Sequence, residues 1–158
     1  MIQLRDMHAT EYDRYRTLSL REYLDDLRTN FGYCASTAEE ECERSLPTSL
    51  AEVMDEPGNA LLVIERNGAG IGYAWLRQEG RIGHLLDLII APEHRQQGHG
   101  RLALGLIQAR LQASGSESMQ LRVAADNPRA RRMYEASGLR VTGVLMAKPL
   151  RSHTWQGL

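Results

Sequence analysis

The chain has 158 residues, a length that fits one domain, and a formal net charge of −1. No apolar run reaches the length of a membrane span, and the first residues lack the basic-then-apolar pattern of a signal peptide, so we expect a cytoplasmic protein with no membrane partner. Cys34 and Cys42 are too few for a disulfide framework or a metal site. We expect both to be free thiols.

The net charge conceals an asymmetry between the two parts of the chain. Residues 1–58 hold 6 Arg against 13 Asp and Glu, a net charge of −7. Residues 59–158 hold 13 Lys and Arg against 7 Asp and Glu, a net charge of +6. Two ligands of opposite charge would explain this pattern, and so would charges scattered over solvated faces.

The acidic part begins with a predicted strand and continues with predicted helices. Ile2 and Leu4 alternate with polar residues, which is typical of a short strand. Residues 9–28 carry apolar side chains at three- and four-residue steps and predict an amphipathic helix. A second helix is expected from about Ser36 to Leu46, where Pro47 ends it. The segment Pro47 to Asn59 is predicted to be a loop.

The periodicity then changes from helix to strand. Ala60 to Glu65 and Ile71 to Arg77 predict two strands, joined by the turn 67–70, because Asn-Gly between apolar runs is a strong hairpin signal. A third strand covers Leu85 to Ala91, whose length and branched side chains fit a strand buried on both faces. These three strands predict an antiparallel meander.

The basic part continues with alternating helices and strands. A helix begins at Gly98 and ends near Ser114-Gly115, and Met119 to Ala124 is the next predicted strand. A strand-helix-strand unit makes this strand parallel to the Leu85–Ala91 strand. Asp126-Asn127-Pro128 begins another helix, with Asn127 or Asp126 as its N-cap.

The last helix is expected to close at Gly138. Leu139 to Val144 and Leu145 to Leu150 then predict two short final strands. Arg151 to Leu158 is predicted to be a loose tail. We therefore expect a single domain over residues 1–150 and a C-terminal tail over residues 151–158.

The loop before the Gly98 helix is a candidate phosphate site. Gly98 and Gly100 lie where free main-chain N–H groups gather at a helix N-terminus, and glycine lets a phosphate approach the backbone closely. Arg95 and Arg101 add fixed positive charge. A Walker-type nucleotide loop is excluded, because no Lys-Ser/Thr pair follows the glycines.

A dinucleotide-binding domain is the remote alternative. Gly98-His-Gly100-Arg-Leu-Ala103 fits G-x-G-x-x-A, and Asp126 lies about where a ribose-binding acid would be. However, seven residues, 91–97, separate the strand from the first glycine. The 58 residues after Gly100 are also too few for the remaining parallel strands.

Three motifs together resemble the GNAT superfamily of acyl-CoA-dependent N-acetyltransferases. Arg95-Gln-Gln-Gly98-His-Gly100 is similar to its acetyl-CoA signature R/Q-x-x-G-x-G/A. Asn127-Pro-Arg-Ala130-Arg-Arg-Met-Tyr134-Glu-Ala-Ser-Gly138-Leu139 looks like the second signature, N-x-x-A-x-x-x-Y-x-x-x-G-F, and Met146-Ala-Lys148-Pro-Leu150 resembles the M-x-K-x-L ending. The departures are Gln97, His99 where an apolar residue is usual, and Leu139 in place of Phe.

The resemblance implies an α/β (α+β) fold: a mixed, mostly antiparallel sheet of six to seven strands, helices on both faces and one splayed parallel strand pair. It also implies direct transfer of an acetyl group from acetyl-CoA, the cosubstrate, to a primary amine in a ternary complex, without a metal. The alternative within the same fold is a catalytically silent domain that binds CoA as a sensor or structural module.

The resemblance also assigns site residues. A main-chain N–H at Leu88 would stabilise the oxyanion, and Tyr134 matches the family's general acid, although its spacing with Ala130 also suits a core aromatic. Ile90 would pair with the pantetheine arm, and the amides of residues 96–101 would bind the pyrophosphate. The cofactor-binding candidates are Leu88, Ile90, Arg95, Gln96, Gln97, Gly98, His99, Gly100, Arg101, Asn127, Ala130 and Tyr134.

The proton acceptor for the attacking amine stays open between His84, Asp87 and a water. Some family members have a Glu near the start of this strand, where this chain has His84. Strand alternation predicts that His84 and Asp87 point to opposite faces, so that only one of them reaches the site. His94 and His99 are expected to be solvated loop residues.

The acceptor is expected to be a cationic amine, either a small molecule or an amine of a peptide. In the family, the first two helices and the following loop border the acceptor side, and here they are rich in acidic residues: Asp25, Asp26, Glu39, Glu40, Glu41, Glu43, Glu52, Asp55 and Glu56. Nucleic acid is not expected as a partner, because the basic residues form no contiguous run. A homodimer is compatible with the sequence.

Overall fold

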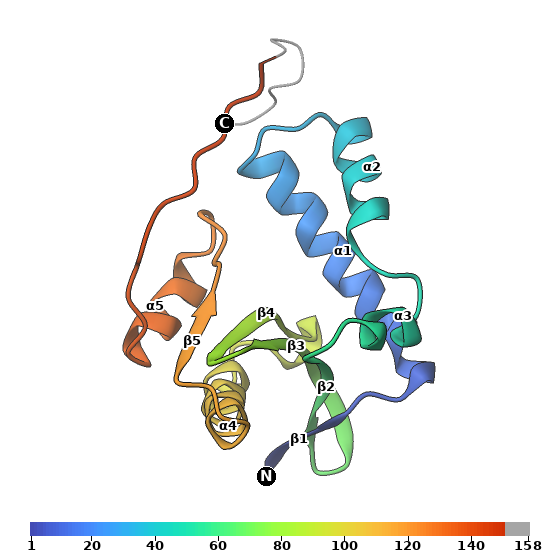
Figure 1. Ribbon diagram of the computed structural model, residues 1–158. Coiled ribbons are helices and arrows are strands. Elements are labelled where there is room, and N and C mark those ends of the chain that lie inside the picture. The colour runs from blue at the N-terminus through green and yellow to red at the C-terminus, as the bar shows by residue number, and fades with distance from the viewer. Residues whose placement is uncertain (151–158) are drawn as a thin grey trace. The chain divides into compact units, whose positions relative to one another are not determined.

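The structure is a computed structural model that describes residues 1–150 (Figure 1). The helices are α1 (Tyr12–Thr29), α2 (Ala35–Ser45), α3 (Leu50–Asp55), α4 (His99–Ala113) and α5 (Pro128–Ala136), with 3-10 turns at Ala9–Glu11 and Pro92–His94. The strands are β1 (Ile2–Asp6), β2 (Asn59–Arg66), β3 (Ala69–Glu79), β4 (Ile82–Ile90) and β5 (Ser118–Leu121). Residues 151–158, the predicted tail, lie outside the described residues.

The chain divides into two compact units. The first contains residues 1–19 and 47–122, and therefore the whole sheet, α3, α4 and the beginning of α1. The second contains residues 20–46 and, of the described residues, 123–150, and therefore the rest of α1, α2 and α5. None of the helices within residues 1–150 combines the length and apolar character needed to cross a membrane.

The sheet of the first unit confirms the predicted mixed fold. Its five strands follow the order β1-β2-β3-β4-β5; the first four are antiparallel, and β5 runs parallel to β4. The β2–β3 hairpin turns at Asn67 and Gly68, whose φ angles of 51° and 85° are the left-handed values that an Asn-Gly turn requires. The parallel β4–β5 pair, joined through α4, is also as predicted.

Helices cover both faces of this sheet within the first unit. On one face, Ala103 of α4 packs with Ile64 and Ile71. The helix lies so close to β4 that a Cβ atom on Gly83 would be 2.7 Å from the side chain of Leu111. On the other face, Tyr15 at the beginning of α1 packs with residues of β2, β3 and β4. The sheet is therefore the middle layer of the unit.

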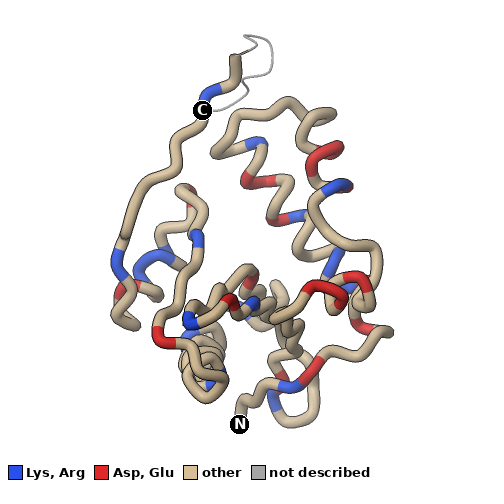
Figure 2. Tube along the Cα trace, viewed as in Figure 1, with Lys and Arg blue, Asp and Glu red and all other residues tan. Residues whose placement is uncertain are grey.

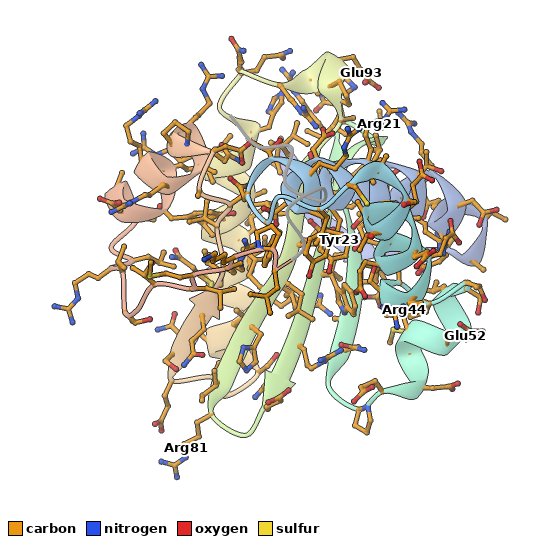
Figure 3. All side chains as sticks on the ribbon, turned by 90° about the horizontal axis from the view of Figure 1, so that it is seen from above. Arg21, Tyr23, Arg44, Glu52, Arg81 and Glu93 are labelled. Carbon is orange, nitrogen blue, oxygen red and sulfur yellow. The ribbon has the colours of Figure 1, made fainter. Side chains whose placement is uncertain are left out.

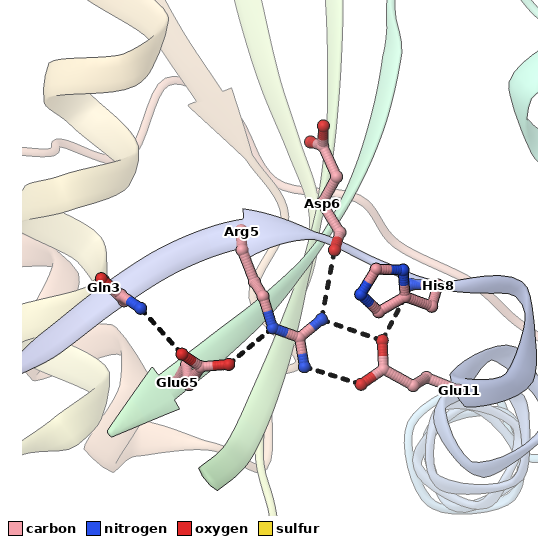
Figure 4. Close-up of polar contacts among 6 residues, drawn as sticks. All are labelled: Gln3, Arg5, Asp6, His8, Glu11 and Glu65. Atoms are coloured by element: carbon pink, nitrogen blue, oxygen red, sulfur yellow. Dashed lines mark hydrogen bonds and ion pairs between the residues drawn. The ribbon is translucent and has the colours of Figure 1, made fainter. Parts of the chain in front are cut away.

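An ion-pair network fixes the edge of the sheet at β1 (Figure 4). The guanidinium of Arg5 donates to Glu65 of β2 at 2.6 Å and to Glu11 at 2.7 Å. The second oxygen of Glu11 accepts a 2.8 Å hydrogen bond from the main-chain N–H of His8. These contacts, led by the hydrogen bond from Arg5, lower the pKa of Glu11 to about 2.

The second unit has a small core of its own. Leu27 of α1 and Ala38 and Cys42 of α2 are buried together. The amide of Asn30 donates to the carboxylate of Asp126 at 2.8 Å, which links the end of α1 to the segment before α5. The side chain of Asn127 accepts from the N–H of Ala130, so Asn127 is the N-cap of α5, one of the two predicted candidates.

Two predicted segments are corrected. The loop expected over Pro47 to Asn59 contains the short helix α3, because Ser49 caps it by accepting from the N–H of Glu52. The final strands expected over Leu139–Val144 and Leu145–Leu150 are absent, so the described sheet has five strands rather than six or seven. Alternating apolar residues make a strand possible, but a strand also needs a partner, and side chains such as Val144 and Met146 are exposed here.

Candidate active site

The parallel β4–β5 ladder leaves half of one β4 edge open. It joins Ile82 through Leu85 to Ser118 through Leu121 and stops there, although β4 continues to Ile90. Arg81 lies in the turn before β4, and Glu93 lies just after it, at the other end (Figure 3). Beyond Leu85 the β4 edge that faces away from β3 therefore has no strand beside it among residues 1–150.

The hydrogen-bond pattern shows which main-chain groups this open edge carries. Paired residues of an antiparallel ladder alternate between pairs that exchange hydrogen bonds and pairs that do not. The N–H of Ala91 donates to the carbonyl of Ile71 at 2.9 Å, and these two residues are opposite each other when the β3–β4 register is continued by one pair. Ala91 therefore belongs to a pair that exchanges hydrogen bonds. The next such pair along β4 contains Ile89. Leu88 and Ile90 therefore direct their N–H and C=O groups to the open edge. The carbonyl of Ile90 accepts a 2.8 Å hydrogen bond from Nε of Arg95 there.

The loop between β4 and α4 presents free main-chain donors. Gln96 and Gly98 have left-handed φ angles of 62° and 80°, and Gly98 is the N-cap of α4. Successive amides in such alternating conformations form a concave anion-binding arrangement. Within residues 1–150, the amides of residues 96–101 have no main-chain acceptor. The positive end of the α4 dipole, with Arg95 and Arg101 in or beside the loop, makes this a site for an anion.

His99 does not lie where the sequence predicted. It is the first residue of α4 and is buried, with 6% of its surface exposed, rather than solvated. An apolar residue is usual at this position of the acetyl-CoA signature, and the first turn of α4 directs the position toward the interior. Its Nε2 is 3.3 Å from Oε1 of Gln97, whereas Nδ1 has no hydrogen-bond partner. Burial, assisted by the charges of Arg66 and His94, lowers the pKa of His99. His94 itself is half-buried.

His84 and Asp87 lie on the same face of the sheet, contrary to the prediction of opposite faces. The β3–β4 register pairs Leu76 with Leu85 and Trp75 with Asp87, so Leu86 is an extra residue in β4. Such a bulge shifts the alternation by one residue. Directly opposite residues of a ladder share a face, and His84 is opposite Arg77 while Asp87 is opposite Trp75. Trp75 and Arg77 are two residues apart in β3 and so lie on one face. His84 and Asp87 therefore both belong to the face that Tyr15 covers.

Asp87 is the most enclosed acid on that face. Its Oδ2 accepts hydrogen bonds from the hydroxyls of Tyr15 at 2.9 Å and Ser19 at 2.7 Å, both on α1. Loss of hydration raises the pKa of Asp87, and the hydrogen bonds from Ser19 and Tyr15 only partly oppose this. A carboxylate with a raised pKa is a stronger base than a solvated one.

His84 lies toward the more open end of the same face. Its side chain is 27% exposed, and Nε2 is 3.7 Å from the carboxylate of Glu79. Its cross-strand partner is Arg77, whose Nε donates a 3.0 Å hydrogen bond to Oδ1 of Asn59. One imidazole (His84), two carboxylates (Glu79 and Asp87) and one guanidinium (Arg77) thus occupy neighbouring positions of β3 and β4.

The second unit carries the remaining candidates, Asn127, Ala130 and Tyr134. Asn127 caps α5, and its side-chain oxygen is occupied by the N–H of Ala130. Tyr134 lies two turns into the helix and is half-buried, and its carbonyl accepts from the N–H groups of Ser137 and Leu139. Asn127 and Ala130 therefore act together in starting the helix that carries Tyr134.

The structure brings together Leu88, Ile90, Arg95 and the 96–101 loop at one end of β4, with Asp87 beside Leu88. Sequence reasoning did not assign Ser19 or Arg77 to the site, and it did not predict the bond from Tyr15 to Asp87. A polar Ser19 four residues after Tyr15 on the apolar side of a helix was the available signal, because such a residue needs a buried partner. The Arg77 contacts depend on strand register and had no local signal.

Acidic residues recur along α1, α2 and α3 (Figure 2). Part of this charge is committed to local structure. The carboxylate of Glu52 accepts from both the N–H and the hydroxyl of Thr48 at the start of α3. The remaining acids of these helices keep the N-terminal part of the chain negative, as the composition predicted.

The β4–β5 pair opens beside the glycine-capped helix α4, and main-chain donors lie along the open edge, an arrangement suited to a ligand that carries an anion and an extended polar arm. The profile of the acetyltransferase (GNAT) family matches residues 10–139. This match covers most of the chain, and the chain therefore belongs to the GNAT family.

The chain is also similar to proteins of known sequence or structure. It is 23% identical to the uncharacterized N-acetyltransferase YycN of Bacillus subtilis (strain 168), over 94% of this chain and 99% of that protein. The crystal structure of YycN superimposes with a TM-score of 0.85 over 96% of this chain and all of that one. The structure of the aminoglycoside N-acetyltransferase AAC(6')-Iy with a CoA bisubstrate analogue, 17% identical, gives a TM-score of 0.60 over 96% of this chain and 99% of the other.

Proposed function

We propose that this protein transfers an acetyl group from acetyl-CoA to a primary amine by direct attack within a ternary complex. The observation that carries the proposal is the open edge of β4, where the N–H groups of Leu88 and Ile90 point away from β3 beside a loop of free amides. The family membership and the CoA-bound structures of AAC(6')-Iy support the same assignment.

The donor set suits acetyl-CoA in two places. The amides of residues 96–101 and the side chains of Arg95 and Arg101 would hold the pyrophosphate, because a helix N-terminus alone contributes only about 0.3–2 kcal/mol. The main chain of Ile90 would pair with the pantetheine arm. The proposed cofactor-binding set also includes Gln97 and His99, which shape the loop before α4. It further includes Asn127 and Ala130, which shape the N-terminus of α5.

The bound acetyl-CoA supplies an activated acetyl group. The N–H of Leu88 donates to the carbonyl oxygen on which negative charge develops, and such a donor contributes about 3–4 kcal/mol to transition-state stabilisation. The reaction forms an N–C bond to the amine and breaks the C–S bond. Asp87 accepts the proton that the ammonium group loses, and Tyr134 donates a proton to the departing sulfur.

We assign the proton acceptor to Asp87 rather than His84. Asp87 precedes Leu88 directly, and burial raises its pKa, so its carboxylate is a better base than a solvated one. His84, at the more exposed end of the face beside Glu79, connects the site to solvent. The acidic helices favour an acceptor that carries positive charge, such as a polyamine, an amino sugar, or a lysine or N-terminal amine of a peptide.

Thiol release from acetyl-CoA with a panel of amines tests the proposal. We expect release that depends on the amine, and a Tyr134→Phe variant that binds CoA normally in calorimetry but turns over at least tenfold more slowly. No release with any amine, together with tight CoA binding, would instead support the catalytically silent CoA module. No heat of CoA binding would refute both functions.

A further inference from the structure

Arg77 is a cation on the same sheet face as the proposed base, and its charge has no counter-ion in the described part of the chain. Its Nε donates to Oδ1 of Asn59 at 3.0 Å, and its guanidinium carbon is 5.6 Å from the centroid of the Trp75 ring. Within residues 1–150 no carboxylate pairs with it, and its terminal NH2 groups have no acceptor. A guanidinium leaves these two groups in the fork geometry that binds a carboxylate.

The position of this guanidinium is fixed by a buried amide. Asn59 is 9% exposed, and its Nδ2 donates to the carbonyl of Val53 at 2.7 Å. This bond orients the side chain so that Oδ1 faces both Nε1 of Trp75, at 3.0 Å, and Nε of Arg77. An arginine that is already stacked and hydrogen-bonded loses little conformational freedom when it binds an anion.

The strand register gives the spacing between this cation and the reacting centre. Trp75 is opposite Asp87, and Arg77 is two residues further along β3 on the same face. Arg77 is thus a diagonal neighbour of Asp87, and such positions lie about 7–8 Å apart. An acceptor with its amine at Asp87 would therefore meet Arg77 with a group about 7–8 Å away from that amine.

The neighbouring charges favour a carboxylate over a phosphate. Glu79 follows Arg77 by two residues on the same face, and its carboxylate is 3.7 Å from Nε2 of His84. A doubly charged phosphate at Arg77 would be repelled by Glu79 more strongly than a singly charged carboxylate would. Arg77 is also the cross-strand partner of His84, so the anion would lie toward the open end of the face.

We propose that Arg77 binds a carboxylate of the acceptor, so that the substrate is a zwitterion whose reacting amine and carboxylate are about 7–8 Å apart. An extended amino acid with a terminal amine has this form. Free lysine that reacts at its side-chain amine is one case. The inference rests on the proposed function, because it places the reacting amine at Asp87.

Two substrate pairs that differ only by a carboxylate provide the test. One pair is 6-aminohexanoate and pentylamine, and the other is lysine and cadaverine. We expect the intact protein to use the carboxylate-bearing member of each pair with a kcat/KM at least tenfold higher. In Arg77→Gln this ratio should fall to about one, and in Arg77→Lys it should take an intermediate value.

Arg81→Gln is the matched control. Arg81 is 79% exposed, pairs with Glu117 and lies in the turn after β3, so this variant removes one positive charge outside the site. It should keep the wild-type ratio. Equal use of both members by the intact protein, or an unchanged ratio in Arg77→Gln, would overturn the carboxylate site while leaving amine acetylation intact. Absence of turnover with every amine would refute the proposed function itself.

Discussion

The phenol of Tyr15 donates a 2.9 Å hydrogen bond to Oδ2 of Asp87, a residue 72 positions further along the chain. Ser19, one turn after Tyr15 on α1, donates to the same oxygen. Both donors stabilise the ionised carboxylate, whereas burial favours the neutral acid and dominates. The pKa of Asp87 is therefore set by α1 as well as by its own strand.

Replacement of Asp87 by Asn should separate catalysis from stability. The amide oxygen can still accept from Tyr15 and Ser19, but it cannot accept a proton, so kcat should fall about 100-fold or more. Because the folded-state pKa of Asp87 is raised, its contribution to stability is present below the unfolded pKa and is lost as the pH rises through the folded pKa. At pH 7 the variant should be at least as stable as the wild type in urea. A marked loss of stability with normal kcat would contradict this role.

Removal of one donor to Asp87 should shift the pH dependence of turnover. In Tyr15→Phe the carboxylate loses the Tyr15 hydroxyl and keeps that of Ser19, so the pKa of Asp87 should rise further. The acid limb of the kcat–pH profile should move to higher pH, while kcat at its plateau changes little. Thr17→Val is the control, because the Thr17 hydroxyl donates to the carbonyl of Asp13 within its own helix. An unmoved acid limb in Tyr15→Phe would exclude Asp87 as the titrating base.

The sequence predicted features that depend on local pattern. The Asn67-Gly68 hairpin, the Gly98 helix start and the Asn127 cap each follow from the conformational preferences of one or two residues. The parallel β4–β5 pair followed from the connection through a helix. These features place the loop of residues 96–101 and the carboxyl end of β4 correctly.

The features that sequence reasoning missed depend on pairing. The bulge at Leu86 leaves no local mark, because an extra residue interrupts a period-two pattern only when the partner strand is known. It determines that His84 and Asp87 share a face. Likewise, residues 139–150 have the apolar alternation of strands but form no strand in the described chain. The inward direction of His99 depends on which side of α4 faces the sheet.

Gly98→Ala should weaken both the fold and the binding of acetyl-CoA. The φ angle of Gly98 is 80°, and a Cβ there would touch nothing, so the cost is backbone strain of about 1–2 kcal/mol rather than a clash. If the loop relaxes, its amides turn away from the anion, and we expect the KM for acetyl-CoA to rise several-fold.

Gly105→Ala is the matched control in the same helix. Gly105 lies within α4 at an ordinary helical φ with open space around it, so Ala should stabilise the protein by about 0.5–1 kcal/mol and leave the KM for acetyl-CoA unchanged. Thermal unfolding and steady-state kinetics measure both quantities. A Gly98→Ala variant that behaves like Gly105→Ala would show that the left-handed cap is dispensable.

The thiol of Cys34 should react much faster than that of Cys42. Hydrogen bonds from the hydroxyls of Ser36 and Thr37 lower the pKa of Cys34 to about 7, whereas burial raises the pKa of Cys42. Alkylation by iodoacetamide in the folded protein should therefore modify Cys34 with a rate that rises through pH 7, and Cys42 only after unfolding. Mass spectrometry of the peptides distinguishes the two sites. Equal rates at both thiols would contradict the prediction.

Glu11→Gln should remove an acid-sensitive part of the stability. Since the pKa of Glu11 is lowered to about 2, its ion pair with Arg5 stabilises the fold above the unfolded carboxyl pKa of 4.5 and is lost as the pH falls through about 2. At pH 7 the variant should lose about 1–2 kcal/mol, because the contact is a charged hydrogen bond in a partly exposed site. Urea unfolding at pH 7, 4 and 3 should show the difference from wild type shrinking toward low pH.

Glu117→Gln, which breaks the exposed pair with Arg81, should change stability by no more than about 0.5 kcal/mol at any of these pH values. A difference for Glu11→Gln that stays constant with pH would show that shape, rather than charge, holds the β1 edge.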